Sequence, residues 1–333
     1  MKEMSPRGTA VSNQGATGPA NGDLFPVAVA GRATGCPLCG SQQALRVQTL
    51  EVMSVVRRWR QCYQIDVARQ FGDLASFELF QCQVCSLRYF SPRWLAGSSE
   101  LYEQLEKQNW YYLPRKWEHD IALRDLRSCG RVIEVGCGFG DFLAFARAEA
   151  QLEVEGLEQN ESAVRTARGR GLPVRRLDIG EAAARFPGSY DAVCIFQVLE
   201  HVPNPGEFLR AACALLKLGG MLLLGLPNAE SFLRYEFNPL DLPPHHMTRW
   251  TKQVLQQLPR MLPIRLERVR LEPLAENHVD CYTDAYCCAW ARKTGLGWLG
   301  HPRVKGIVAK FIRHSGIRRA LLGHTLYARY RRV

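Results

Sequence analysis

Two pairs of cysteines near the start of the chain have the spacing of a metal site. Cys36 and Cys39 form one C-x-x-C pair, and Cys82 and Cys85 form the other. Each pair can offer two thiolates from one tight turn, and four thiolates complete the tetrahedral shell of a structural Zn²⁺ without leaving a position open for catalysis. We therefore expect a zinc-ribbon-like module, with an inserted element around residues 52–63 between the two pairs. A degenerate module that has lost its metal is the main alternative.

A run of glycines later in the chain has the pattern of a ligand-binding loop. Gly136, Gly138 and Gly140 follow an apolar segment that is typical of a buried strand, and they precede an amphipathic segment. Glycine at such a turn permits positive φ angles and lets a ligand approach the backbone closely. Asp141 stands where the dinucleotide pattern G-x-G-x-x-G requires its third glycine, so a pyrophosphate ligand is disfavoured.

Two acidic residues occupy matching places in the next two strand–helix units. Glu158 ends the second expected strand, and Asp178 ends the third. A carboxylate at the first place can accept two hydrogen bonds from a ribose diol, and one at the second place can meet an adenine amino group. Open parallel sheets bind their ligands at the carboxyl ends of the strands. The glycines and the two acids together therefore predict a site for a ligand that contains ribose and adenine.

The elements around these residues indicate the fold class. Short apolar segments alternate with amphipathic segments from residue 131 onward, which is typical of an α/β fold with a largely parallel sheet. We expect four regions: a disordered leader at 1–34, the cysteine module at 35–95, a helical linker or lid at 96–128, and the α/β domain with a basic C-terminal extension at 129–333.

Composition narrows the classes further. The chain has 333 residues, of which 47% are hydrophobic and 23% charged, as in globular proteins and unlike mainly disordered, collagen-like or coiled-coil chains. No window resembles a membrane span, the first residues lack a signal-peptide core, and the cysteines suggest thiols or metal ligands, so we expect a cytoplasmic protein. Lys and Arg exceed Asp and Glu by 11, and residues 301–333 contain nine Lys or Arg and no acid. Such a segment either attracts anions or forms a solvated basic face.

Several of these segments resemble class I S-adenosylmethionine-dependent methyltransferases of a bacterial type 11/23-like subgroup. The similarity covers residues 131–270 through the segments VIEVGCGFG, GLEQN, LDIGEAA, YDAVCIFQVLEHV, LLKLGGMLLLGLPN and PPHHMTRW. The segment LRYFSP, after the second cysteine pair, resembles N-terminal zinc modules of methyltransferases that modify sugars or glycan precursors. The resemblance implies a Rossmann-like sheet with helices on both faces, an antiparallel last strand near residues 326–330, and S-adenosyl-L-methionine as cofactor.

The resemblance also implies a role for each matching residue. An aromatic segment at residues 109–112 would cap the cofactor, together with Trp117. The expected cofactor contacts are Gly136, Gly138 and Gly140 with the methionine part, Glu134 with the loop or the ammonium group, Glu158 with the ribose hydroxyls, Asp178 with the adenine amino group, and Gln197 near the sulfonium.

Methyl transfer to a hydroxyl also requires a base. His246 and His245 follow the fifth strand and His201 follows the fourth, and histidine is the usual base near neutral pH. We rank these three as candidate catalytic residues in that order. Two alternatives remain open: His201 packs against or caps the following helix, and the adjacent histidines form a metal site with Asp241.

The sequence thus predicts a methyltransferase that acts on a small molecule, above all a sugar, glycan precursor or glycolipid in polysaccharide biosynthesis. The basic C-terminus is a candidate for peripheral contact with a membrane. One alternative is a methyltransferase of ribosomal or transfer RNA, because a basic tail suits phosphates. Nucleic acid is the less favoured partner, because the cysteine region has no dense basic and aromatic patch. The other alternative is a non-catalytic scaffold that retains the fold.

Overall fold

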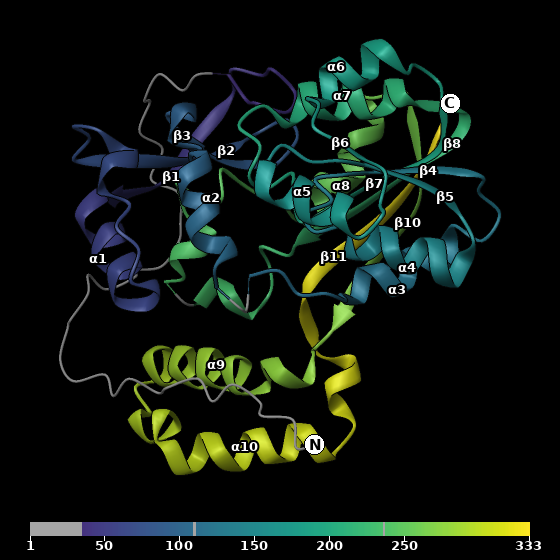
Figure 1. The fold of residues 1–333 in the computed structure, drawn as a ribbon. Coiled ribbons are helices and arrows are strands. Elements are labelled where there is room, and N and C mark those ends of the chain that lie inside the picture. The colour runs from purple at the N-terminus through teal and green to yellow at the C-terminus, as the bar shows by residue number, and fades with distance from the viewer. Residues whose placement is uncertain (1–34, 109–110, 236) are drawn as a thin grey trace.

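Two β-sheets organise the chain. The computed structural model describes residues 35–108, 111–235 and 237–333, so the expected leader at 1–34 lies outside the described residues. The smaller sheet has the strand order β1-β2-β3-β9, and the larger has the order β10-β11-β8-β7-β4-β5-β6 (Figure 1). In the larger sheet, β5 and β6 lie on one side of β4, and β7 and β8 lie on the other. Parallel strands in this order are joined by crossover helices, which confirms the α/β fold class.

The larger sheet is parallel except at one edge. Strands β6, β5, β4, β7 and β8 run parallel, whereas β11 is antiparallel to both β8 and β10. The antiparallel last strand is therefore confirmed. Strand β6 is short because Asp178 already begins the next helix as its N-cap. The strands are β4 (Arg131–Val135), β5 (Glu153–Leu157), β6 (Val174–Arg175), β7 (Tyr190–Phe196), β8 (Leu216–Pro227), β10 (Ile264–Pro273) and β11 (Leu322–Arg332).

Helices cover both faces of this sheet. In the central strand β7, Val193 and Ile195 join one hydrophobic core, and Ala192 and Cys194 join the other, because successive side chains of a strand point to opposite faces. Helices α6, α7 and α8 pack into the first core, and α3, α4 and α5 into the second. Their bounds are α3 (Trp117–Asp125), α4 (Asp141–Ala150), α5 (Glu161–Gly169), α6 (Ile179–Arg185), α7 (Pro205–Leu215) and α8 (Lys252–Gln257).

The smaller sheet belongs mainly to the cysteine module. Helix α1 occupies Val52–Tyr63, which confirms the inserted element, and it packs on the sheet through Val55, Val56 and Trp59. Helix α2 joins the same core, so the region expected as a linker divides between the two sheets: α2 packs on the small one and α3 on the large one. The remaining bounds are β1 (Ala44–Glu51), β2 (Ser76–Cys82), β3 (Arg88–Ser91), α2 (Ser99–Glu106) and β9 (Thr248–Arg249).

The cysteine module docks on the first turn of α7. The Gly206 amide donates a 3.1 Å hydrogen bond to the Pro37 carbonyl, and a Cβ at position 206 would lie 2.4 Å from the Leu38 carbonyl oxygen. Arg93 donates to the side-chain oxygen of Asn204 over 2.9 Å. Only a glycine at position 206 allows the two backbones to approach this closely.

The basic C-terminal segment does not form a single extension. Helices α9 (Val279–Thr294) and α10 (Pro302–His314) follow β10 and precede β11 in the sequence. They form a pair that lies apart from both sheets (Figure 1). The last residues instead enter the sheet as β11, where Arg329 pairs with Asp125 and Glu267, and Arg331 pairs with Glu267. No helix among the described residues is long and apolar enough to cross a membrane.

Candidate active site

The glycine loop joins β4 to α4 at the carboxyl edge of the large sheet. Gly136, Gly138 and Gly140 have φ angles of 76°, 51° and 79°, so any other residue would be strained at all three positions. A Cβ at Gly138 would lie 3.0 Å from the ring of Tyr112, and one at Gly136 would lie 2.5 Å from a methyl group of Val198. The loop therefore presents bare backbone, as a closely bound ligand requires.

Glu158 follows β5 and is tied to the glycine loop. One carboxylate oxygen accepts a 2.9 Å hydrogen bond from the Gly138 amide, and the other accepts bonds from the amides of Gln159 and Asn160 at 2.7 and 2.8 Å. A carboxylate has about four lone-pair sites, so one remains for a ribose hydroxyl. Glu158 thus also positions the glycine loop, through its hydrogen bond from the Gly138 amide. The sequence position of Glu158 alone does not predict this role.

Asp178 also has a structural role. It is the N-cap of α6 and accepts a 2.7 Å hydrogen bond from the Gly180 amide. Its other oxygen accepts a 3.3 Å bond from the side chain of Gln159. The carboxylate is exposed, so an adenine amino group can reach it from solvent.

Glu134 provides a direct test of whether the site fits the implied cofactor. Its carboxyl is buried at the end of β4, and its Oε2 atom has no hydrogen-bond partner among the described residues. Burial raises its pKa well above the usual value. A buried acceptor without a partner is costly, and an ammonium group such as that of S-adenosylmethionine would satisfy it. The unpaired carboxyl oxygen of Glu134 therefore fits the ammonium group of this cofactor.

Gln197 has an unusual backbone conformation. It follows β7 with a φ of 56°, which is uncommon for a residue other than glycine. Its side-chain amide donates a 2.8 Å hydrogen bond to Glu118, a buried residue of α3 that the sequence patterns do not single out. Such strained residues occur at ligand sites, which is consistent with the expected place of Gln197 beside the cofactor.

Two adjacent tyrosines connect the glycine loop to the candidate bases. The Tyr112 ring packs on Phe139 at a centroid distance of 4.6 Å, and the Tyr111 hydroxyl lies 3.1 Å from His245 Nε2. Residues 109–110, the other half of the expected aromatic cap, lie outside the described residues.

The three candidate histidines form one cluster. Their ring centroids are separated by 4.5 Å (His201–His245), 4.8 Å (His201–His246) and 4.6 Å (His245–His246). Each Nδ1 faces an oxygen. The Nδ1 of His201 lies 2.8 Å from the His245 carbonyl, that of His245 lies 2.9 Å from the Leu240 carbonyl, and that of His246 lies 3.3 Å from Asp241 Oδ1. Because an oxygen acceptor fixes the proton on Nδ1, Nε2 carries the lone pair in each ring.

Burial and charge set the protonation of this cluster. Burial lowers the pKa of His201 to about 3 and that of His245 well below its usual value, so both rings are neutral at neutral pH. Burial raises the pKa of Asp241, but the hydrogen bond with His246 and the nearby Arg249 guanidinium outweigh it and hold that pKa below its ordinary value. Asp241 is therefore an anion beside His246.

One nitrogen from each of the three histidines lies within 4.8 Å of the others, a possible metal group that contains His201 in place of the Asp241 expected in the metal alternative. His245, however, has a partner at both nitrogens, namely the Leu240 carbonyl and the Tyr111 hydroxyl. The His201 Nε2 atom faces a carboxyl oxygen of Glu200 at 3.8 Å, whereas no partner of the His246 Nε2 atom is found in the described part of the chain.

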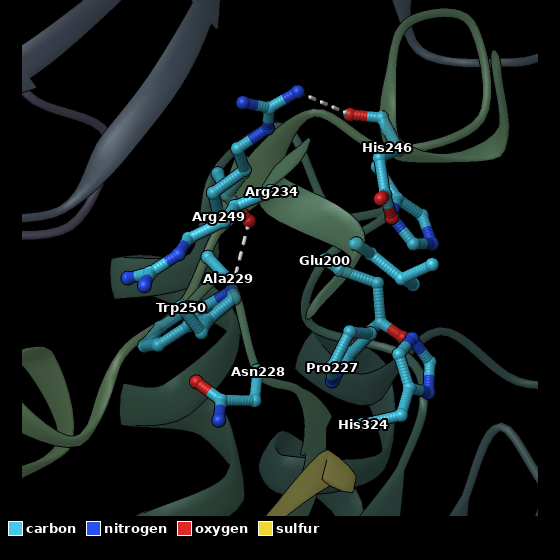
Figure 2. Close-up of a pocket in the computed structure, with 12 residues that line it drawn as sticks. Glu200, Pro227, Asn228, Ala229, Arg234, His246, Arg249, Trp250 and His324 are labelled. Atoms are coloured by element: carbon cyan, nitrogen blue, oxygen red, sulfur yellow. Dashed lines mark hydrogen bonds and ion pairs between the residues drawn. The ribbon is translucent and has the colours of Figure 1, made fainter. Parts of the chain in front are cut away.

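A small pocket opens beside the cluster, lined by Glu200, Asp241 and His246 among others. Figure 2 shows Glu200, His246 and His324 along one side and Arg249 and Trp250 along the other. Sequence reasoning missed His324, Arg249 and Trp250. His324 lies in β11, far from the other pocket residues in the sequence, and no local motif marks it. Arg249 and Trp250 lie in the PPHHMTRW segment, which by itself assigns no role to either residue.

The four cysteines come together at the edge of the small sheet. Cys36 Sγ lies 3.6 Å from Cys85 Sγ, and Cys39 Sγ lies 3.5 Å from Cys82 Sγ. Tetrahedral Zn²⁺ with Zn–S bonds of about 2.3 Å needs S–S separations of about 3.8 Å. Both turns close alike, with positive φ angles of 77° at Gly40 and 65° at Ser86. The donor set therefore fits a structural zinc ion, which stays a proposal.

Zinc content tests this proposal. We expect purified protein to contain one zinc ion per chain, and Cys82→Ser to lose it and to unfold at lower temperature, because one ligand of the tetrahedral set is missing. The control is Cys62→Ser, which removes an exposed thiol of α1. Metal analysis and thermal unfolding measure both effects. Equal zinc contents in the two variants would contradict the site.

The buried Glu200 predicts a pH-dependent stability. Burial raises its pKa from 4.5 to about 7. The folded state therefore holds a proton that the unfolded state has released, and the free energy of unfolding falls as the pH rises from 4.5 through 7. Glu200→Gln, which does not ionise, should gain up to about 3 kcal/mol relative to the parent protein over this range. Denaturant unfolding at several pH values measures it.

The control for this experiment is Glu153→Gln, whose side chain is 73% exposed. It should follow the parent protein at every pH. Parallel pH profiles for Glu200→Gln and the parent protein would contradict the assigned protonation.

Part of the chain is similar in sequence to known methyltransferases. Residues 109–297, more than half of the chain, match the family described as "Methyltransferase domain". The ubiquinone biosynthesis O-methyltransferase of Bordetella pertussis is 38% identical over 111 residues, which cover 31% of this chain and 46% of that protein. The enzyme of the same name from Xanthomonas campestris pv. campestris (strain B100) is 37% identical over 114 residues, or 32% and 47%. The chain thus spans about half the length of the curated relatives it matches.

Solved structures of the same class are also similar. A SAM-dependent methyltransferase from Archaeoglobus fulgidus is 20% identical, with a TM-score of 0.42 over 65% of this chain and 94% of that one. A possible histamine N-methyltransferase from Thermotoga maritima is 19% identical, with a TM-score of 0.44 over 71% and 98%. On the strength of the family match, the chain belongs to the class I S-adenosylmethionine-dependent methyltransferases.

Proposed function

We propose that the protein transfers a methyl group from S-adenosylmethionine to a hydroxyl of a small molecule. The observation that carries the proposal is the Asp241–His246 pair, which lines a pocket beyond the carboxyl ends of β7 and β8. The cofactor supplies an electrophilic methyl group on its sulfonium. The chain has to bind it, align the acceptor and take up the acceptor proton.

Cofactor binding is assigned to the carboxyl edge of the large sheet. The bare backbone of the glycine loop faces the methionine part, and Glu134 holds the ammonium group with its free oxygen. Glu158 uses its remaining lone pair for the ribose, and Asp178 meets the adenine from the start of α6. Gln197 stands near the sulfonium. Tyr112, packed on the glycine loop, shields this site from water.

His246 is the proposed base. Asp241 accepts its Nδ1 proton, which leaves the Nε2 lone pair to accept a proton from the acceptor hydroxyl. When the acceptor oxygen takes the methyl group that the bound cofactor would supply, the acceptor proton would move to Nε2, and the Asp241 anion would stabilise the resulting imidazolium. His245 holds Tyr111 through Nε2, and His201 bonds the His245 backbone, so both position the base.

The lining of the pocket favours a polar acceptor. Asn228, Asp241 and Arg249 all face it, and the side-chain Nδ2 of Asn228 has no partner among the described residues. We therefore propose a sugar, glycan precursor or glycolipid with several hydroxyls. The relatives named above favour a second candidate, an intermediate of ubiquinone biosynthesis. Both candidates accept the methyl group on oxygen. A cytoplasmic location stays a prediction.

Replacing the base tests the proposal. His246→Ala should lower the rate of methyl transfer by about 10²–10⁴-fold, the usual contribution of a general base, while the affinity for S-adenosylmethionine stays unchanged. Asp241→Asn should also lower the rate, because the imidazole loses its orienting anion. His314→Ala, on the exposed end of α10, serves as the control. The measurement is transfer of labelled methyl groups to sugar, lipid-linked sugar and phenol acceptors.

Full activity in His246→Ala would contradict the assignment of the base. Methylation of phenols alone would favour the second candidate over a sugar acceptor, and methylation of RNA alone would contradict both.

A further inference from the structure

The helix pair α9–α10 exposes large apolar side chains to solvent. Trp290 is 55% exposed, Trp298 59%, Ile307 70% and Phe311 61%. Ile307 and Phe311 are four residues apart on α10 and therefore lie on the same face of the helix. Exposed apolar groups in such number on one small helix pair indicate an interaction site.

This exposure is not a sign that the pair is poorly packed. Lys305 of α10 pairs with Asp284 of α9 over 2.7 Å, and Arg313 pairs with Asp280 over 2.6 Å. Ala309 and Ile312 are buried in a core that they share with α9. One side of α10 thus packs on α9, and Ile307 and Phe311 remain exposed to solvent outside this core.

The same surface is basic. Residues 285–333 contain no Asp or Glu at all. Exposed cationic side chains lie on α9 and α10, before and after the connection η7 (Gly297–Gly300) in the sequence. They are Arg292, Lys293, Arg303 and Lys310.

We propose that the surface formed by α9, η7 and α10 docks on a membrane that contains anionic lipids. Apolar and aromatic groups enter the boundary between headgroups and acyl chains, and Lys and Arg beside them attract the anionic headgroups. Tryptophan is especially favoured at this depth. A second copy of the chain would place two basic surfaces face to face, and RNA would neutralise the cations but leave Ile307 and Phe311 in water. Neither matches both features.

The docking surface is also continuous with the acceptor pocket. The short helix η3 (Phe232–Tyr235) packs on α9, where Tyr235 meets Tyr286 at a centroid distance of 5.0 Å. Leu233 and Arg234 of the same helix line the pocket. A docked protein would therefore hold its pocket close to the lipid surface, which suits a lipid-linked acceptor. This last step rests on the proposed function, whereas the docking itself does not.

Co-sedimentation with lipid vesicles tests docking on the full chain without cofactor. We expect binding to vesicles of phosphatidylcholine mixed with phosphatidylglycerol, weaker binding at high salt, and little binding to phosphatidylcholine alone. Trp298→Ser combined with Phe311→Ser should reduce the partition coefficient by at least about tenfold, because two aromatic groups no longer enter the lipid. Arg303→Glu combined with Lys310→Glu should reduce it similarly on anionic vesicles.

Matched controls come from the cysteine module. Trp94 is 58% exposed, and Arg57 and Arg58 are exposed on α1. Trp94→Ser and the double change Arg57→Glu with Arg58→Glu should leave binding unchanged. Equal binding of all variants would overturn the proposal, as would self-association or RNA binding that depends on the same residues in place of vesicle binding. Methyl transfer to a water-soluble acceptor should persist in Trp298→Ser/Phe311→Ser, so a failure of the proposed function is recognised separately.

Discussion

The connection between β8 and α8 joins the two sheets through β9, and the candidate active site depends on this double attachment. The segment leaves β8, contributes β9 to the small sheet beside β3, and returns to the large sheet at Trp250, which bridges to Asn228. Between these points the amides of Met247 and Thr248 both donate to the Glu200 carbonyl, at 2.7 and 3.1 Å. His245 and His246 are therefore held between the two sheets. The cysteine module supports this arrangement from outside, because its turn rests on Gly206.

The polar groups of the site show where ligands are needed. A buried polar group without a partner is costly, and folded proteins contain few of them. Among the described residues, the unpaired atoms include Glu134 Oε2 beside the glycine loop, and Glu200 Oε2 and Asn228 Nδ2 in the pocket. The three candidate histidines, by contrast, each have an oxygen at Nδ1. The protein thus fixes its candidate base internally and leaves open the groups that face the expected cofactor and acceptor.

The fold and the local motifs were predictable because their signals are local. Apolar strands followed by Gly or acidic residues predict the carboxyl edge of the sheet, and the spacing of Cys36 and Cys39 predicts a metal turn. The attachment of β9 to the small sheet was not predictable, since it pairs residues about 160 positions apart and β9 has two residues. His324 enters the pocket for the same non-local reason. The basic C-terminus was expected to act as one segment, but Arg329 and Arg331 pair with acids of distant elements, whereas Arg303 and Lys310 of α10 are exposed.

Binding of S-adenosylmethionine tests the central claim most directly. Isothermal calorimetry on zinc-replete protein should show saturable one-to-one binding. Glu158→Gln should weaken it at least about tenfold, because the neutral amide accepts fewer hydrogen bonds from the loop and the ribose. Glu153→Gln, at the opposite end of β5, should bind as the parent protein does. Absence of binding by well-folded protein, or equal affinity in the two variants, would contradict a cofactor site at the carboxyl edge of the sheet.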